Sequence, residues 1–333
     1  MGTAGFEGDV RRAGVRDVAA LAGVSTQTVS RVINDHPSVR DETRRRVQDA
    51  MLELGYRVNN AARTLGTRRT RTLGVIASNA ALFGPSSAAV ALEAAARAAG
   101  RWVTTAYADA SDESSTLASL EHLLLQGVDG IVVVAPRLST VAMLRRQDAG
   151  VRVAALPSDS GVDVQAEGAR LAVEHLLALG HRRIARLGGP ADWLEEAARS
   201  NGFDEAMRRA GLETVARWSG DWSASSGAAV APEVAEVVRS GAATAVVVTN
   251  DQMALGLVSG LVSAGLSVPQ DVSIIGYDDN TDAAFYRPAL TTVRVDVEDE
   301  ARRCVAEVLG LAEVRAPVDP PRLVVRESTA PVG

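Results

Sequence analysis

The chain has little of several residue types, and each scarcity excludes a class of protein. Cys304 is the only cysteine among 333 residues, so an intrachain disulfide and a cysteine cluster for a metal are impossible. No apolar run reaches membrane-spanning length, and residues 1–13 lack the apolar core of a secretory signal. We therefore expect residues 1–13 to be a disordered tail and the protein to be cytoplasmic, without membrane contact.

The sequence also lacks the usual signs of an enzyme. No Ser-His-Asp set, phosphate-binding loop or metal cluster stands out, and the four histidines lie in unrelated places. We therefore expect no catalytic residue, no cofactor and no metal. Lysine is absent as well, because all 35 basic residues are arginine.

The segment 14–31, which reads GVRDVAALAGVSTQTVSR, predicts two short helices joined by a tight turn. Val18, Leu21 and Ala22 would give the first helix an apolar face. Gly23 permits the turn, and Ser25 can cap the second helix.

The second of these helices would carry polar side chains outward. Thr26, Gln27 and Arg31 face away from the apolar side, and glutamine and arginine can bond purine edges in the major groove of DNA. This is the pattern of a helix-turn-helix, although an ordinary helical hairpin with a polar surface is the alternative.

The surrounding sequence favours DNA binding. A third helix at about 41–54 would complete a small core, so residues 14–58 form an all-α head. From Arg11 to Arg71 thirteen arginines stand against six acids, a local charge of +7 on a chain whose total is −6. A basic head on an acidic body concentrates the attraction for phosphate at one end of the molecule.

Residues 59–71 connect this head to the rest of the chain. Residues 59–65 could form fewer than two helical turns, which is too short to be stable alone in water. The segment is either a helix that folds only against a partner or a plain basic linker.

Residues 72–333 predict an α/β body with two parallel sheets. Short β-branched runs alternate with amphipathic helical stretches, and residues 156–168, rich in Ser, Asp and Gly, suggest a break between two lobes. Polar residues such as Asn250 and Asp278 follow the strands. Because ligands bind beyond the carboxyl ends of parallel strands, two facing sheet edges would form a polar cleft.

Several motifs resemble those of the lac repressor family of bacterial transcription regulators. They are RDVAALAGVSTQTVSRVIN, AARTLG, ARLAVEHLLALGH, TNDQMALG and VSIIGYDD followed by PALTTVR, and they cover nearly the whole chain in order. The resemblance implies a helix-turn-helix head followed by a two-lobed effector domain like that of periplasmic binding proteins. It implies a repressor of sugar-utilisation genes that binds a pseudo-palindromic operator and is released by a small sugar, such as a β-galactoside.

On the DNA side, the resemblance assigns functions to six residues. Thr26, Gln27 and Arg31 match the positions that read base edges. The remaining three, Asn59, Ala62 and Leu65, fall in the hinge helix, with Leu65 as the minor-groove wedge. Val58 stands where the family usually has proline.

In the effector cleft the resemblance assigns Pro85, Ser86, Arg199, Trp222, Asn250 and Asp278 to the ligand. Arg, Asn and Asp supply donors and acceptors for sugar hydroxyls, while an indole packs on the C–H face of a pyranose. Trp193 is added as an aromatic surface of the cleft, with packing inside its own lobe as the alternative. Read singly, Arg199 could be a solvated helix residue and Trp222 a core residue.

The chain departs from the family pattern in two ways, and three other functions remain as alternatives. Pro157, Val295 and Val297 replace polar or aromatic ligand residues of the family, and the chain lacks a leucine-heptad tail after Val325. We therefore expect a homodimer. The alternatives are a purine or phosphosugar corepressor, a sugar-binding transport protein, which would need a secretory signal, and an enzyme.

Overall fold

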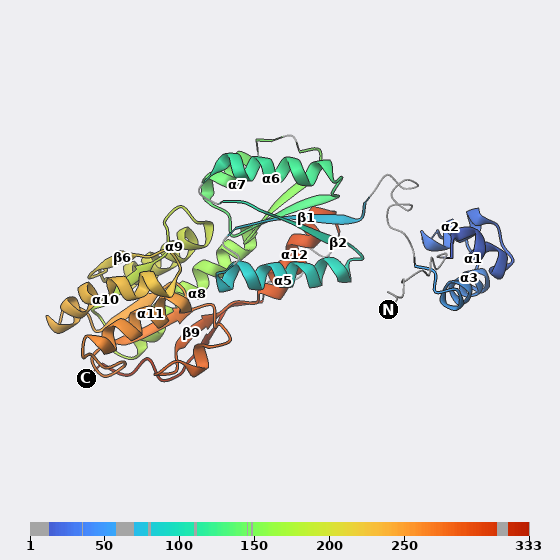
Figure 1. Cartoon of the computed structure of the whole chain (residues 1–333). Helices are drawn as coiled ribbons and strands as arrows, with labels where there is room; N and C mark the ends of the chain where they lie inside the picture. Colours follow the sequence, from blue (N-terminus) through green and yellow to red (C-terminus); the bar gives the residue numbers. More distant parts are fainter. Residues whose placement is uncertain are drawn as a thin grey trace, which may run out of the picture. The chain divides into compact units, whose positions relative to one another are not determined.

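A computed structural model describes residues 13–34, 36–57, 70–78, 81–109, 112–144, 146–147, 149–311 and 319–332. The chain divides into two compact units, Met1–Thr70, here called the head, and Arg71–Gly333, the body, and each is described by itself (Figure 1). Residues 1–12 of the predicted tail (1–13) and the predicted hinge residues Asn59, Ala62 and Leu65 lie outside the described residues.

The head contains the three predicted helices. They are α1 (Val15–Ala22), α2 (Thr26–Ile33) and α3 (Asp41–Glu53). Gly23 ends α1 in the left-handed conformation, with φ 63°, and Ser25 caps α2 by accepting a hydrogen bond from the Thr28 amide at 3.1 Å. Val29 and Val47 are fully buried where the helices meet.

One prediction for the head core is wrong. Leu21 is 46% exposed, and Ala19 is buried in its place beside Val18 and Ala22. At about 100° per residue, Leu21 points roughly 100° away from the centre of the face that these three residues share. In so short a helix, size and spacing alone did not identify the buried side.

The first lobe of the body is a four-stranded parallel sheet of order β2-β1-β3-β4. Its strands are β1 (Thr72–Ala77), β2 (Trp102–Tyr107), β3 (Gly130–Val134) and β4 (Arg152–Leu156), and its helices are α5 (Phe83–Ala98), α6 (Glu113–Leu125) and α7 (Leu138–Leu144). Alternate strand residues serve opposite faces: Val75 packs on the α5 side, whereas Ile76 packs with α6 and α7. Burial on both faces explains the continuous apolar runs in β1 and β3.

The second lobe is a six-stranded sheet of order β10-β9-β8-β7-β5-β6, parallel except for the β9–β10 pair. Its strands are β5 (Ile184–Gly188), β6 (Arg217–Ser219), β7 (Ala245–Val248), β8 (Ser273–Tyr277), β9 (Thr291–Arg294) and β10 (Arg322–Val324). Its helices are α8 (Asp159–Ala178), α9 (Leu194–Arg209), α10 (Ala224–Arg239) and α11 (Asp251–Ser263), with a 3-10 turn at Ala283–Phe285. Helices α8 and α9 cover one face of the sheet, and α10 and α11 cover the other.

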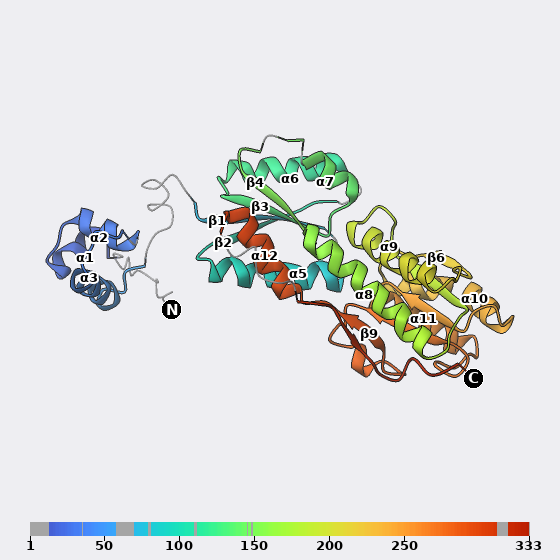
Figure 2. The ribbon, with the colours of Figure 1, turned by 180° about the vertical axis from the view of Figure 1, so that it is seen from behind.

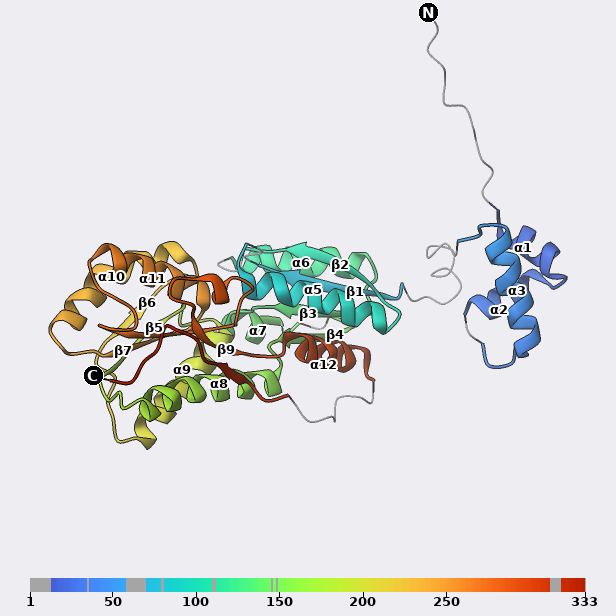
Figure 3. The ribbon, with the colours of Figure 1, turned by 90° about the horizontal axis from the view of Figure 1, so that it is seen from below.

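The chain crosses between the lobes more often than the sequence predicted. After β9 it returns to the first lobe, where α12 (Val297–Leu309) packs on α5, β3 and β4, and it then re-enters the second lobe at β10. Figures 1 and 2 show α12 lying beside α5, and Figure 3 shows it against the β3 and β4 side of the first lobe. The first lobe is thus built from segments that lie far apart in the sequence.

The predicted break at 156–168 contains the first crossing between the lobes, although most of the segment is helical. Only residues 157–158 separate β4 from α8, which begins at Asp159 with Ser158 as its cap; the Ser158 hydroxyl accepts from the Gly161 amide at 3.3 Å. Residues of the types Ser, Asp and Gly occur both in loops and at helix starts, and here they start a helix.

None of the described helices combines the length and the apolar character that crossing a membrane requires. Within the same described ranges, no three His, Cys, Asp or Glu side chains are grouped so that they could hold a metal ion.

Candidate functional site

The exposed side of α2 is the candidate DNA-binding surface of the head. Thr26, Gln27 and Arg31 are all exposed, whereas Val29 and Val32 of the same helix are buried. Gln27 and Arg31 lie one helical turn apart and therefore share a face. The predicted base-reading residues thus form one polar surface at the start and middle of the helix.

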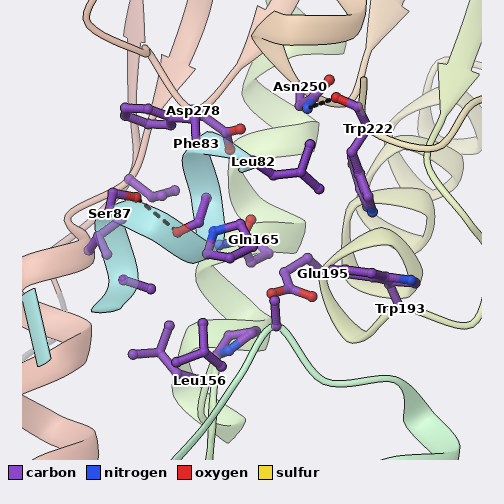
Figure 4. Close-up of a pocket in the computed structure, with 18 of the residues that line it drawn as sticks. Leu82, Phe83, Ser87, Leu156, Gln165, Trp193, Glu195, Trp222, Asn250 and Asp278 are labelled. Atoms are coloured by element: carbon purple, nitrogen blue, oxygen red, sulfur yellow. Dashed lines mark hydrogen bonds between the residues drawn. The ribbon is translucent and has the colours of Figure 1, made fainter. Parts of the chain in front are cut away.

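The body contains a pocket of about 710 Å³, including its solvent-open part, between the two lobes (Figure 4). Its lining consists of Leu82, Phe83, Gly84, Pro85, Ser87, Ala88, Val134, Ala135, Leu156, Pro157, Gln165, Trp193, Glu195, Arg199, Trp222, Asn250, Asp278, Val295, Val297 and Glu300. Several of these residues directly follow strands, as expected for a ligand site at the carboxyl ends of parallel sheets.

Arg199 on α9 is the best-connected polar residue of the pocket. Its Nε donates to Gln165 Oε1 at 2.8 Å, its Nη2 donates to Asp278 Oδ1 at 3.0 Å, and its Nη1 donates to the carbonyl of Thr249. The guanidinium carbon also lies 3.9 Å from the centre of the Tyr277 ring. Arg199 is only 6% exposed, so it is not the solvated helix residue of the alternative interpretation.

Asn250 and Trp222, near this arginine, are joined by a hydrogen bond. Asn250 caps α11 by accepting from the Met253 amide at 2.9 Å, and its Nδ2 donates to the Trp222 carbonyl at 2.9 Å. Trp222 has a positive φ of 75°, a conformation that few non-glycine residues adopt. Gly189 makes room for the indole, because a Cβ at that position would overlap the Trp222 ring.

Trp193 and Trp222 form an aromatic wall on one side of the pocket. Their ring centroids are 6.0 Å apart and their planes cross at 64°, an edge-to-face arrangement. Trp193 is buried and also forms a β-bridge with Arg137 of the first lobe, next to the Arg137–Asp192 ion pair at 2.7 Å. Trp193 therefore packs in the core and lines the pocket at the same time.

Most of the predicted effector residues meet in this pocket. Pro85, Trp193, Arg199, Trp222, Asn250 and Asp278 all line it. Ser86 does not: it is exposed, and the next residue, Ser87, lines the pocket instead. Because Pro85 and Ser86 lie in the first turn of α5, adjacent side chains point about 100° apart. Pro157, Val295 and Val297 make their part of the lining apolar.

Besides Ser87, sequence reasoning missed three polar residues of the lining, which are Gln165, Glu195 and Glu300. Burial raises the pKa of Glu195 to about 8 and that of Glu300 to about 7. Glu195 precedes Arg199 by one helical turn, and that spacing could have revealed it. Glu300 stands in an acid-rich helix start with no local sign of burial.

The pocket is therefore rich in acceptors and poor in positive charge. Three carboxyl groups line it, those of Glu195, Asp278 and Glu300, against the single guanidinium of Arg199. Burial also raises the pKa of Asp278, although Arg199 opposes this. Such a site suits a ligand with several hydrogen-bond donors better than an anionic one.

Comparison with known proteins agrees with this division into head and body. Residues 14–59 match the model of "Bacterial regulatory proteins, lacI family", and residues 173–329 match a "Periplasmic binding protein-like domain". The lactose operon repressor of Escherichia coli (strain K12) is 36% identical over 309 residues, covering 90% of this chain and 85% of that protein.

Solved structures give the same result. A lac repressor dimer bound to operator and the anti-inducer ONPF matches with a TM-score of 0.76 and 32% identity, covering 96% of this chain and all of that one. A complex of the transcriptional regulator CelR with cellobiose matches with a TM-score of 0.67 and 29% identity, covering 95% of this chain and all of that one.

Proposed function

Because this chain belongs to the lacI family of bacterial regulatory proteins, we propose that it represses transcription as an operator-bound homodimer that a small sugar releases. A dimer places two copies of α2 on the two halves of a pseudo-palindrome. Its partner is genomic DNA, which places its action in the cytoplasm. Thr26, Gln27 and Arg31 would contact base edges, and Asn59, Ala62 and Leu65 would act in the minor groove.

The observation that carries the sugar assignment is the buried Arg199–Asp278 pair beside Trp222. The guanidinium carbon of Arg199 lies 5.8 Å from the centre of the Trp222 ring. A pyranose packed against the indole would therefore be within reach of both the Arg199 guanidinium and the Asp278 carboxyl group. This combination of a planar apolar face with adjacent donors and acceptors suits vicinal hydroxyls. A β-galactoside is the first class to test, since the related lac repressor carries similar motifs.

We infer that the sugar acts by joining the lobes. Arg199, Trp222 and Asn250 belong to the second lobe, whereas Leu82 and Pro85 belong to the first, so one ligand contacts both. The ligand binds best to the closed arrangement of the lobes, whereas DNA binds best to a different arrangement. The two binding events are therefore coupled, and each weakens the other.

The shortage of positive charge in the pocket separates this proposal from the corepressor alternative. A phosphosugar would bring its phosphate toward three carboxyl groups and a guanidinium that Asp278 already pairs. A purine lacks this conflict and could stack on the aromatic wall. A purine effector therefore remains one possible outcome of the thermal-unfolding test below.

Thermal unfolding of the full-length protein tests the proposal. A panel of galactosides, glucosides, other sugars and purines should contain one sugar that raises the midpoint, since a ligand at about 100 times its Kd adds about 2.7 kcal/mol. Arg199→Ala should abolish that shift and Arg199→Lys should weaken it, whereas Arg208→Ala, on the exposed side of the same helix, should retain it. A shift with a purine alone, or one that survives in Arg199→Ala, would refute the sugar assignment.

A further inference from the structure

Glu195 and Glu300 approach the ligand space from opposite lobes. Glu195 stands in the first turn of α9, which packs in the second lobe, and Glu300 stands in the first turn of α12, which packs in the first lobe. Both line the same pocket, and the charge of Glu300 contributes to the raised pKa of Glu195. The sugar-binding residues assigned above do not account for this pair.

Glu195 presents an acceptor that the protein itself leaves unused. Its Oε2 atom is buried, and none of the described residues donates a hydrogen bond to it. A buried unpaired acceptor is costly unless a ligand supplies the donor. Figure 4 shows the Glu195 carboxylate in the middle of the lining, beside Trp193.

Glu300 is held in position on the other side. Its Oε1 accepts from the Ser158 amide at 3.2 Å, and the space at Gly161 is filled by this carboxylate, because a Cβ there would overlap Glu300 Oε1. Ser158 lies in the crossing from β4 to α8. The carboxylate is thus fixed where the two lobes join.

The buried guanidinium groups of these two helices and of strand β5 are already paired with other carboxylates. Arg199 pairs with Asp278 at 3.0 Å, Arg186 with Glu196 at 2.6 Å and Arg303 with Asp299 at 2.7 Å. Glu195 and Glu300 therefore face the pocket as two acids for which the described residues provide no ion-pair partner.

We propose that Glu195 and Glu300 together bind a positively charged amino group, and that the effector is accordingly an amino sugar. An ammonium group has three donors, enough to bridge two carboxylates, and the Trp193 ring beside Glu195 adds an aromatic face that favours a cation. Placed between the lobes, the ammonium removes the repulsion that opposes their closure. This inference rests on the proposed function, since it names the class of sugar at the same site.

The test compares sugars that differ at one group. Glucosamine and galactosamine carry the amine, their N-acetylated forms keep the ring without the charge, and glucose and galactose carry a hydroxyl instead. Binding to the full-length protein is measured calorimetrically at neutral to slightly alkaline pH, close to the raised pKa values of Glu195 and Glu300, so that the acids can ionise while part of the amine is still protonated. At least one hexosamine should bind about tenfold or more tightly than both of its neutral counterparts, as charge-assisted hydrogen bonds allow.

Variants show whether the two acids cause the preference. Glu195→Gln and Glu300→Gln keep the shape and the acceptor oxygen but lose the charge, so the preference for the amine should shrink to about threefold or less. Glu298→Gln, an exposed acid in the same turn of α12, should keep it. A preference that persists in both Gln variants would contradict the assignment.

The outcomes also separate this inference from the proposed function. If neutral hexoses or their glycosides bind as tightly as the amines, and Arg199→Ala abolishes that binding, the sugar site stands and the amino group is wrong. If no sugar binds, or binding does not depend on Arg199, the proposed function itself fails.

Discussion

Trp222 shows how single residues shape the pocket. It adopts a positive φ, its carbonyl accepts from Asn250, and its ring occupies the space that Gly189 leaves by having no side chain. A small residue on one loop and a capped helix on another thus fix one aromatic face. The indole orientation depends on both.

Gly189→Ala should therefore disturb the pocket strongly, although the substitution adds only one methyl group. The added methyl group would overlap the Trp222 ring, and overpacking of this kind typically costs about 1–3 kcal/mol. We expect a lower free energy of unfolding in urea and weaker sugar binding. Gly84→Ala is the control for the free energy of unfolding, since nothing lies within 4 Å of its added Cβ; an equal loss of stability in the two variants would show that the Trp222 contact is unimportant.

The pocket acids predict a specific pH dependence of stability. Unfolded Glu195 loses its proton near its ordinary pKa of 4.5, whereas the folded protein holds it to about 8. The unfolded state therefore binds fewer protons across this range, and stability falls as pH rises. The slope that Glu195 contributes is at most about 1.4 kcal/mol per pH unit, and Glu300 adds to it up to about pH 7.

Urea unfolding of the ligand-free protein across this pH range checks the prediction. Glu195→Gln and Glu300→Gln should each flatten the decline, because the amide does not titrate, while Glu298→Gln should leave it unchanged. Contributions from His175 and His181, whose pKa values burial lowers, cancel in the difference between variant and parent. Parallel curves for all four proteins would contradict the assigned shifts.

At the scale of the elements, the sequence predicted most helices and strands because their signals are local. The Gly23 turn, the Ser25 cap and the apolar runs of β1, β3, β5 and β7 all depend on neighbouring residues. The short strands β6 and β10 were not predicted, since three residues at a sheet edge carry little periodicity.

Only part of the site could be predicted from the sequence, for a related reason. Arg199, Asn250 and Asp278 stand in motifs that the resemblance identifies, so their meeting was expected. Glu300 enters the pocket only because α12 returns to the first lobe after β9, a long-range arrangement that no local pattern encodes. Whether Ser86 or Ser87 lines the pocket likewise depends on how α5 is rotated about its own axis.

Helix α2 predicts a separation of specific from nonspecific DNA binding. Gln27→Ala and Arg31→Ala should each weaken binding to the preferred site by about 1–3 kcal/mol, the usual cost of losing a good base contact. Both residues are exposed, so the fold of the head should be unaffected. Fluorescence anisotropy with a DNA site selected from random sequences and with a scrambled site checks this; an equal loss on both DNAs would indicate phosphate contact alone.

At the scale of the whole molecule, the body places one ligand in contact with both lobes. The chain passes between them around β4, β9 and α12, and the Arg137–Asp192 pair adds a further link beside Trp193. A transport protein could use such a body alone. A helix-turn-helix of the lacI family in the same chain instead makes closure of the pocket a signal for DNA release.

The central claim is this coupling, and it is reciprocal by thermodynamic necessity. The most direct test measures the affinity for a selected operator with and without saturating sugar, and the affinity for the sugar with and without operator. We predict that both affinities fall by the same factor, about 5–150-fold for couplings of ordinary size. A sugar that binds in the pocket and leaves operator affinity unchanged, or raises it, would contradict the account.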